Sequence, residues 1–260
     1  MKTRKYGTSP YQVAVIHGGP GAPGYMAPVA RELSNKLGVL EPIQTCDTIQ
    51  GQIDELHKQL VDDVNSPITL VGSSWGAVLA LLFTVQHQRL VKKLILIGSA
   101  VFDSENSVKS MQTRLDRLDK TKHARFEYIR TEIIKAPINE QNSLLEEQAN
   151  LLFQTDVLNP LTKDLELLEC NYQIHKKVWS DFEKIRDQAG ILEKKLSKIK
   201  IPVVVLHGDY DPHPIDGIKP FLESALDQVT FYILSQCGHY PWIEKCAKKT
   251  FFDILRKEIF

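Results

Sequence analysis

The chain has 260 residues, of which 43% are hydrophobic and 25% charged, as in soluble globular proteins with one sizeable core. Lys plus Arg and Asp plus Glu both total 32, so the formal net charge is zero. This balance gives no electrostatic reason to expect nucleic acid or an anionic membrane as a partner. We expect neither a signal peptide nor a membrane-spanning segment, because the apolar runs are too short for both. The expected location is therefore the cytoplasm.

Short runs of Val, Ile and Leu alternate with helix-length segments along the first hundred residues. These runs are apolar at consecutive positions, which favours parallel strands buried under helices on both faces. The run at 37–45 is weaker because Pro42 interrupts it, and we expect it nearer an edge of the sheet. In chain order, we predict a strand at 12–18, a helix at 25–37, a strand at 37–45, a helix at 48–64, a strand at 67–72, a helix at 74–88 and a strand at 92–100.

The alternation stops in the middle of the chain. Apolar residues between 104 and 198 recur at helical spacing, as in "LLEEQANLLF" (144–153), and no strand-like run occurs there. Strands resume at 201–208 and 229–234, and a last helix is predicted over 241–258. We therefore expect an α/β fold with a mainly parallel sheet of about six strands and an inserted all-helical cap. The predicted division is core at 1–101, cap at 102–198 and core at 199–260.

The stretch "GSSWG" (72–76) follows a predicted strand and precedes a predicted helix. A Gly-x-Ser-x-Gly turn in this position holds its central residue in a strained conformation above the strand ends. That residue is Ser74, which we predict to be a nucleophile, whereas Ser73 occupies the variable position. The turn needs glycine at both flanks, because neighbouring chain passes close by.

The stretch "HGGPG" (17–21) follows the first predicted strand. A glycine-rich loop there can direct backbone N–H groups at a developing oxyanion. The expected donors are the amides of Gly19 and of Trp75, the residue after the nucleophile. His17, at the start of the loop, is interpreted as structural.

The two late strands each lead into a loop with a candidate catalytic residue. "LHGDYDPHP" (206–214) contains Asp211, which we predict to orient an imidazolium, with Asp209 and Asp103 as alternatives. "CGHYPWIE" (237–244) contains His239, the predicted general base, with His213 as its rival. His207 is interpreted as structural. The resulting order of Ser, Asp and His is the one found in α/β-hydrolases.

No sequence motif indicates a metal or a cofactor, and we predict neither. The histidines and cysteines form no H-E-x-x-H or C-x-x-C pattern, and no glycine-rich nucleotide motif is present. We expect the four cysteines to be reduced thiols: Cys46, Cys170, Cys237 and Cys246.

Together these motifs resemble the α/β-hydrolase superfamily. "HGGPG" and "GSSWG" resemble the prolyl aminopeptidase (proline iminopeptidase) branch in particular. The resemblance covers roughly 12–100 and 201–258, and it implies triad roles for Ser74, Asp211 and His239. Two departures concern the substrate: the region "EPIQTCDTIQG" lacks the branch's D-Q-R-G-x-G-x-S-like stretch, and no N-terminal β-hairpin is expected.

The expected function is therefore hydrolysis of a small ester, thioester or amide through an acyl-enzyme on Ser74. Release of N-terminal proline from a short peptide is the alternative, for which a cap carboxylate would bind the free amine; the candidates are Glu132, Glu140, Glu146 and Glu147. A non-catalytic ligand-binding protein on a hydrolase scaffold is the alternative from another class. Composition and motifs leave the substrate-binding residues and the oligomeric state open.

Overall fold

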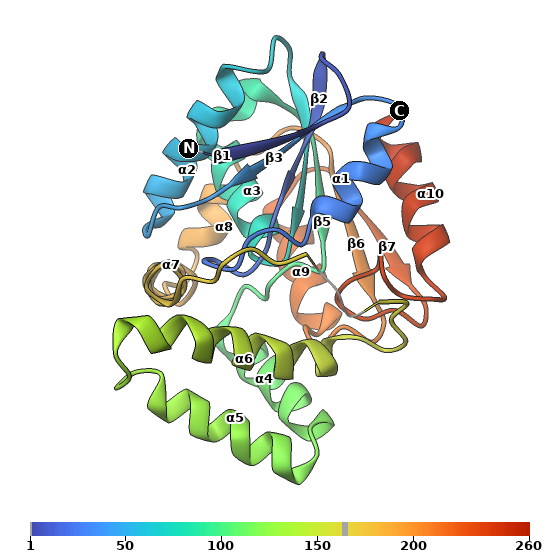
Figure 1. Ribbon diagram of the computed structural model, residues 1–260. Coiled ribbons are helices and arrows are strands. Elements are labelled where there is room, and N and C mark those ends of the chain that lie inside the picture. Colours follow the sequence, from blue (N-terminus) through green and yellow to red (C-terminus); the bar gives the residue numbers. More distant parts are fainter. Residues whose placement is uncertain (1, 163–165) are drawn as a thin grey trace.

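A seven-stranded sheet forms the centre of the molecule (Figure 1). The computed structural model describes residues 2–162 and 166–260. The strand order is β1-β3-β2-β4-β5-β6-β7, with β1 antiparallel to β3 and all other neighbours parallel. The strands are β1 (Lys2–Tyr6), β2 (Tyr11–Ile16), β3 (Gly38–Ile43), β4 (Ile68–Ser73), β5 (Val91–Ile97), β6 (Val203–Gly208) and β7 (Val229–Leu234).

Helices cover both faces of the sheet, which explains why the central strands are apolar at consecutive positions. Ala14 and Ile16 of β2 join one apolar cluster, whereas Val13 and Val15 join the other. The first cluster is completed by α2 (Ile49–Val61), α3 (Trp75–His87), α7 (Tyr172–Arg186), α8 (Ile191–Leu196) and α9 (Ile215–Ala225). The second is completed by α1 (Ala27–Ser34) and α10 (Lys248–Ile259). The predicted α/β architecture is thus confirmed.

The sheet has one strand more than the approximate number expected, because residues 2–6 form the edge strand β1. Its sequence, KTRKY, has no apolar run, and the strand forms by pairing along β3 from Lys2↔Ile43 to Tyr6↔Val39. This pairing places β3 second from the edge of the sheet, with β1 hydrogen bonded along its outer side. Pro42 is tolerated there because β3 pairs with β2 only through Gly38–Leu40, so that Pro42 lies beyond the parallel ladder.

Two boundaries and one helix also differ from the predictions. The strand predicted at 92–100 ends at Ile97, because Gly98 turns the chain with a φ of +48°. The helix predicted from 241 starts at Lys248. Helix α9 was not predicted, and Pro220 lies inside it.

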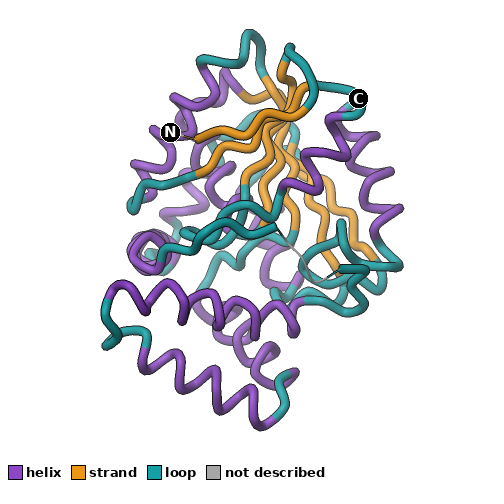
Figure 2. Tube along the Cα trace, viewed as in Figure 1, coloured by secondary structure: helices purple, strands orange, loops and turns teal. Residues whose placement is uncertain are grey.

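The described residues between β5 and β6 form helices joined by loops, as predicted. These helices are α4 (Ser104–Arg117), α5 (Lys120–Glu132) and α6 (Ile138–Asp156), followed by α7 and α8. Helices α4, α5 and α6 lie together beyond the carboxyl ends of the strands, and we call these three helices the cap (Figures 1 and 2). Helices α7 and α8 lie closer to the core, where Val178, Phe182 and Leu196 are buried in the first apolar cluster.

Within the described residues, no helix is both long enough and apolar enough to cross a membrane.

Candidate active site

Ser74 lies at a sharp turn between β4 and α3. Its backbone angles, φ 53° and ψ −117°, are strained for a residue other than glycine, and its side chain is partly accessible. A Cβ at Gly72 would lie 2.2 Å from the carbonyl oxygen of Gly76, and one at Gly76 would lie 2.3 Å from that of Ile16. Both flanks therefore have to be glycine, whereas Ser73 is fully buried. The turn presents one hydroxyl, that of Ser74.

The loop after β2 packs directly against this turn. A Cβ at Gly18 would lie 1.8 Å from the Tyr25 hydroxyl and 2.7 Å from the Cβ of Ser74. Gly19 follows with a φ of +50° and lines the same cavity as Ser74. Trp75 is the first residue of α3, so its N–H has no acceptor within the helix. The two expected oxyanion donors thus belong to segments that meet at Ser74.

Asp211 and His239 come from the loops after β6 and β7 and form a hydrogen-bonded pair. His239 Nδ1 lies 2.7 Å from Asp211 Oδ2, and both side chains are buried. Burial acts to raise the pKa of Asp211, but the neighbouring His239, His207 and His213 hold it well below its usual range. Burial acts to lower the pKa of His239, but Asp211 outweighs it and raises that pKa. Asp211 thus favours the protonated form of His239.

The rival acids have structural positions elsewhere. Asp209 accepts hydrogen bonds from the backbone N–H groups of Gln236 and Cys237. It thereby connects the loop after β6 (209–214, the acid loop) to the loop after β7 (235–247, the histidine loop). Asp103 caps the N-terminus of α4 by accepting a hydrogen bond from the N–H of Asn106. Neither carboxylate contacts His239 among the described interactions.

The other histidines near the site contact backbone groups or Asp211. His17 Nδ1 lies 2.7 Å from the carbonyl oxygen of Gly18, and His207 Nε2 lies 2.9 Å from that of His213. His213 lines the cavity together with His239, and its Nδ1 lies 3.0 Å from Asp211 Oδ1. The two candidate bases therefore share one carboxylate.

Gly98 lies against the Asp211–His239 pair, a role that no motif indicated. A Cβ at Gly98 would lie 2.9 Å from His239 Nδ1 and 3.0 Å from Asp211 Oδ2. The residue also has a φ of +48°, which L-residues rarely adopt. The sequence signal available was a glycine near the end of the strand predicted at 92–100, in "LILIGSA".

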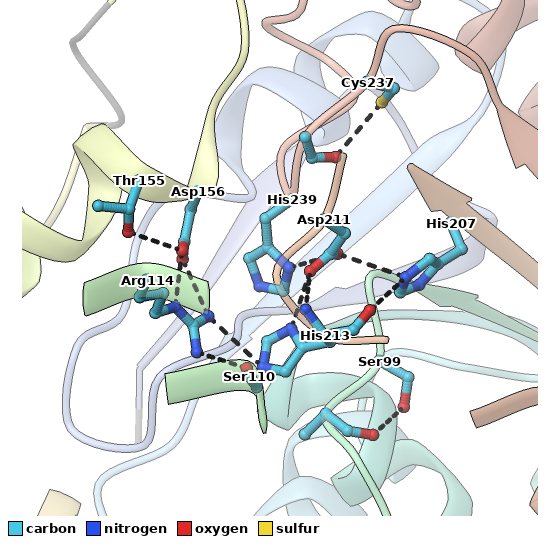
Figure 3. A network of polar contacts seen from close by, with 12 residues as sticks. Ser99, Ser110, Arg114, Thr155, Asp156, His207, Asp211, His213, Cys237 and His239 are labelled. Atoms are coloured by element: carbon cyan, nitrogen blue, oxygen red, sulfur yellow. Dashed lines mark hydrogen bonds and ion pairs between the residues drawn. The ribbon is translucent and has the colours of Figure 1, made fainter. Parts of the chain in front are cut away.

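A buried ion pair from the cap reaches the same place (Figure 3). The Arg114 guanidinium from α4 contacts both carboxylate oxygens of Asp156 at the end of α6, at 2.7 and 3.1 Å. Arg114 also lies 3.5 Å from His213 Nε2, and the backbone N–H of His239 donates to the Asp156 carbonyl oxygen at 2.7 Å. No sequence motif indicates this pair, because its members lie far apart in the chain.

These groups surround a cavity of about 580 Å³ between the sheet and the helices above it. Ser74, His239 and Gly19 line it, as do several apolar side chains: Ala22, Ala100, Val101, Met111, Leu145, Ala149, Leu152, Phe153, Leu167 and Trp179. Its acidic residues are Asp156, Glu166 and Glu183. The four cap glutamates considered from sequence do not line it; Glu147 pairs with Arg125, and Glu132 with Lys135. The cavity is large enough for a small organic ligand.

Asp211, His213 and His239 also have potential metal-ligand atoms within 4.8 Å of one another. A cation bound there would compete for the carboxylate oxygens that both imidazoles already contact. The positive charge of Arg114 beside His213 also opposes cation binding.

Comparison with known proteins supports the fold. The family model described as alpha/beta hydrolase fold matches residues 54–245. A putative proline iminopeptidase of Mycoplasma genitalium is 24% identical over 200 residues, which cover 66% of this chain and 62% of that relative. The proline iminopeptidase of Saccharolobus solfataricus is 27% identical over 258 residues, covering 90% of this chain and 80% of the relative.

Solved structures agree with this assignment. The crystal structure of VinJ has a TM-score of 0.70 at 18% identity, covering 99% of this chain and 93% of its own, a likeness of fold. The family model matches well over half of the chain, and the mainly parallel sheet with helices on both faces agrees with its description. This chain therefore belongs to the α/β-hydrolase fold family and is similar to proline iminopeptidases.

Proposed function

We propose that the protein is a serine hydrolase in which Ser74, His239 and Asp211 form the catalytic triad. The observation that carries this proposal is the strained Ser74 turn, which opens into the cavity where His239 is hydrogen bonded to Asp211. A turn with φ 53° at a non-glycine residue destabilises the fold, and display of a reactive hydroxyl accounts for its presence.

In the proposed reaction, His239 takes the proton of the Ser74 hydroxyl as its oxygen attacks the acyl carbon of the substrate. The amides of Gly19 and Trp75 donate hydrogen bonds to the oxyanion of the tetrahedral intermediate. His239 then gives the proton to the leaving alcohol, thiol or amine, and an acyl-enzyme remains on Ser74. A water molecule, deprotonated by His239, hydrolyses the acyl-enzyme and regenerates the serine. Asp211 stabilises the imidazolium in both half-reactions.

The proposed substrate is a small ester, thioester or amide. The mainly apolar lining of the cavity suits an uncharged acyl group, and its volume of about 580 Å³ suits a small molecule or the end of a short peptide.

Release of N-terminal proline is the second candidate. The curated relatives named proline iminopeptidase favour it, as do the carboxylates that line the cavity. Glu183 is exposed at the cavity and has no ion-pair partner among the described contacts, so it is available for a substrate ammonium group. For proline release, Glu183 is therefore the first residue to test, in place of the four cap glutamates.

The test compares turnover of a short-chain p-nitrophenyl ester with that of proline p-nitroanilide. We expect Ser74→Ala to reduce kcat at least about 10³-fold, because the nucleophile is lost. Ser73→Ala is the matched control, since this buried serine does not line the cavity, and its kcat should stay near that of the wild type. Turnover that survives Ser74→Ala would refute the proposed nucleophile. Binding without turnover of either substrate would favour a ligand-binding protein.

A further inference from the structure

Asp211 is held at both of its carboxylate oxygens. Oδ2 faces His239, whereas Oδ1 accepts a hydrogen bond from the backbone N–H of His213 at 2.9 Å and lies 3.0 Å from His213 Nδ1. The carboxylate is completely buried, so no water replaces these contacts from the surface. A second imidazole therefore fixes the plane of the carboxylate that orients His239.

Asp211, whose ionised carboxylate only accepts hydrogen bonds, and Arg114 together determine which nitrogen of His213 carries the proton. A guanidinium has only donor groups, so His213 Nε2, at 3.5 Å from an Arg114 nitrogen, has to be an acceptor. The proton of the neutral ring is then on Nδ1, from where it is donated to Asp211 Oδ1. Burial and the charge of Arg114 lower the pKa of His213 to about 4, which keeps the ring neutral at neutral pH.

Arg114 is itself fixed by the cap. Besides its two contacts to Asp156, it donates a hydrogen bond to the Ser110 hydroxyl at 2.9 Å. One turn later in α4, Arg117 donates to the Thr155 carbonyl oxygen at 2.7 Å. Its guanidinium also lies 3.6 Å from the ring centroid of Tyr210, the residue before Asp211. Both arginines thus join the end of α6 to the acid loop.

The histidine loop rests on the same end of α6. The backbone N–H of His239 donates to the Asp156 carbonyl oxygen, and a Cβ at Gly238 would lie 2.2 Å from that oxygen. Asp156 therefore contacts the histidine loop through its backbone. It contacts the acid loop through Arg114 and His213, whose side chains Figure 3 shows. A shift of α4 against α6 would disturb both halves of the Asp211–His239 pair.

We propose that His213 and Arg114 are positioning residues that orient the Asp211 carboxylate and couple the catalytic pair to the cap. The inference deepens the proposed function, because it gives these residues an effect on the same hydrolysis. It also makes turnover depend on the position of α4 and α6. A displacement of the cap would leave the Asp211–His239 pair misaligned.

The test uses two variants of nearly equal size, His213→Asn and His213→Leu. The asparagine amide places an N–H donor where Nδ1 stands, whereas leucine fills the same space without one. We expect His213→Leu to lower kcat about 10²-fold, from misplacement of the pair, while KM changes little. His213→Asn should restore kcat to within about fivefold of the wild type. A packing role alone predicts that leucine performs as well as asparagine, and that result would overturn the proposal.

A second readout does not depend on turnover. The Nδ1 proton of His239, shared with Asp211 at 2.7 Å, should give a far-downfield proton resonance that persists in His213→Asn and is lost or shifted in His213→Leu. An unchanged resonance in the leucine variant would overturn the positioning role, even if Ser74→Ala had already refuted the proposed nucleophile. Should the leucine variant not fold, His213→Gln serves instead, because its amide reaches the Nε2 position and leaves the Nδ1 position without a donor.

Discussion

Replacement of Gly98 by alanine tests whether the space beside the Asp211–His239 pair is required for activity. The added Cβ would lie 2.9 Å from His239 Nδ1 and 3.0 Å from Asp211 Oδ2, both inside ordinary van der Waals contact. The chain has a φ of +48° there, so alanine also costs about 1 to 2 kcal/mol in backbone conformation. Movement of the imidazole or of the carboxylate away from the added Cβ relieves the clash and disturbs their 2.7 Å hydrogen bond.

The matched control is Gly190→Ala. Gly190 has a φ of +72°, yet a Cβ there would meet no atom within 4 Å. Both variants should therefore lose about 1 to 2 kcal/mol of unfolding free energy, which corresponds to a melting point lower by a few degrees. Crowding around the new Cβ lowers the unfolding free energy of Gly98→Ala further, whereas Gly190→Ala loses only the backbone conformational contribution.

The assay is ester turnover, with the melting point of each variant measured by circular dichroism. We expect Gly98→Ala to lose up to about 10²-fold in kcat, because a misplacement of about 1 Å in a catalytic site has effects of this order. Gly190→Ala should keep the wild-type kcat. The reasoning would be refuted if the two folded variants had kcat values within about twofold of each other.

Two further predictions concern stability. Burial lowers the pKa of His17 to about 4, from 6.5 in the unfolded chain. As the pH falls from 6.5 to 4, His17 is therefore protonated in the unfolded state but stays neutral in the folded state, which favours unfolding. Protonation of His17 in the unfolded state should therefore lower the free energy of unfolding by about 2 kcal/mol between pH 7 and pH 5. His17→Gln should lack this loss when unfolding by guanidinium is measured at the two pH values. Glu244 is completely buried and accepts hydrogen bonds from the backbone N–H groups of Leu158, Asn159 and Gly238. Glu244→Ala should cost about 3 kcal/mol or more, and Glu244→Gln less, because the glutamine oxygen keeps part of these bonds.

Each of these two predictions has a result that would contradict it. For His17, it is an equal loss of stability in the wild type and the glutamine variant between pH 7 and pH 5. For Glu244, it is an unfolding free energy of the alanine variant within about 1 kcal/mol of the wild type.

The local features of this protein follow from short stretches of sequence. The central strands can be predicted because they are buried on both faces and are therefore apolar at consecutive positions. The turn at Ser74 can be predicted from the sequence because only glycine fits where Gly72 and Gly76 contact neighbouring backbone. Strand β1 could not be read in this way, since its five residues are partly exposed and are held in place by their partner β3. Helix α9 was missed because Pro220 normally argues against a helix interior.

The sequence by itself determined the fold class, the helical insert and the candidates Ser74, Asp211 and His239, because each depends on a pattern within a few consecutive residues. Only the tertiary structure decided which groups meet. It brought Gly98 against the Asp211–His239 pair and joined Arg114 to Asp156 and His213. It also placed Glu183 at the cavity while Glu132 and Glu147 pair with neighbouring cations. Such contacts join residues from separate elements, and their distances depend on how the helices pack over the ends of the strands.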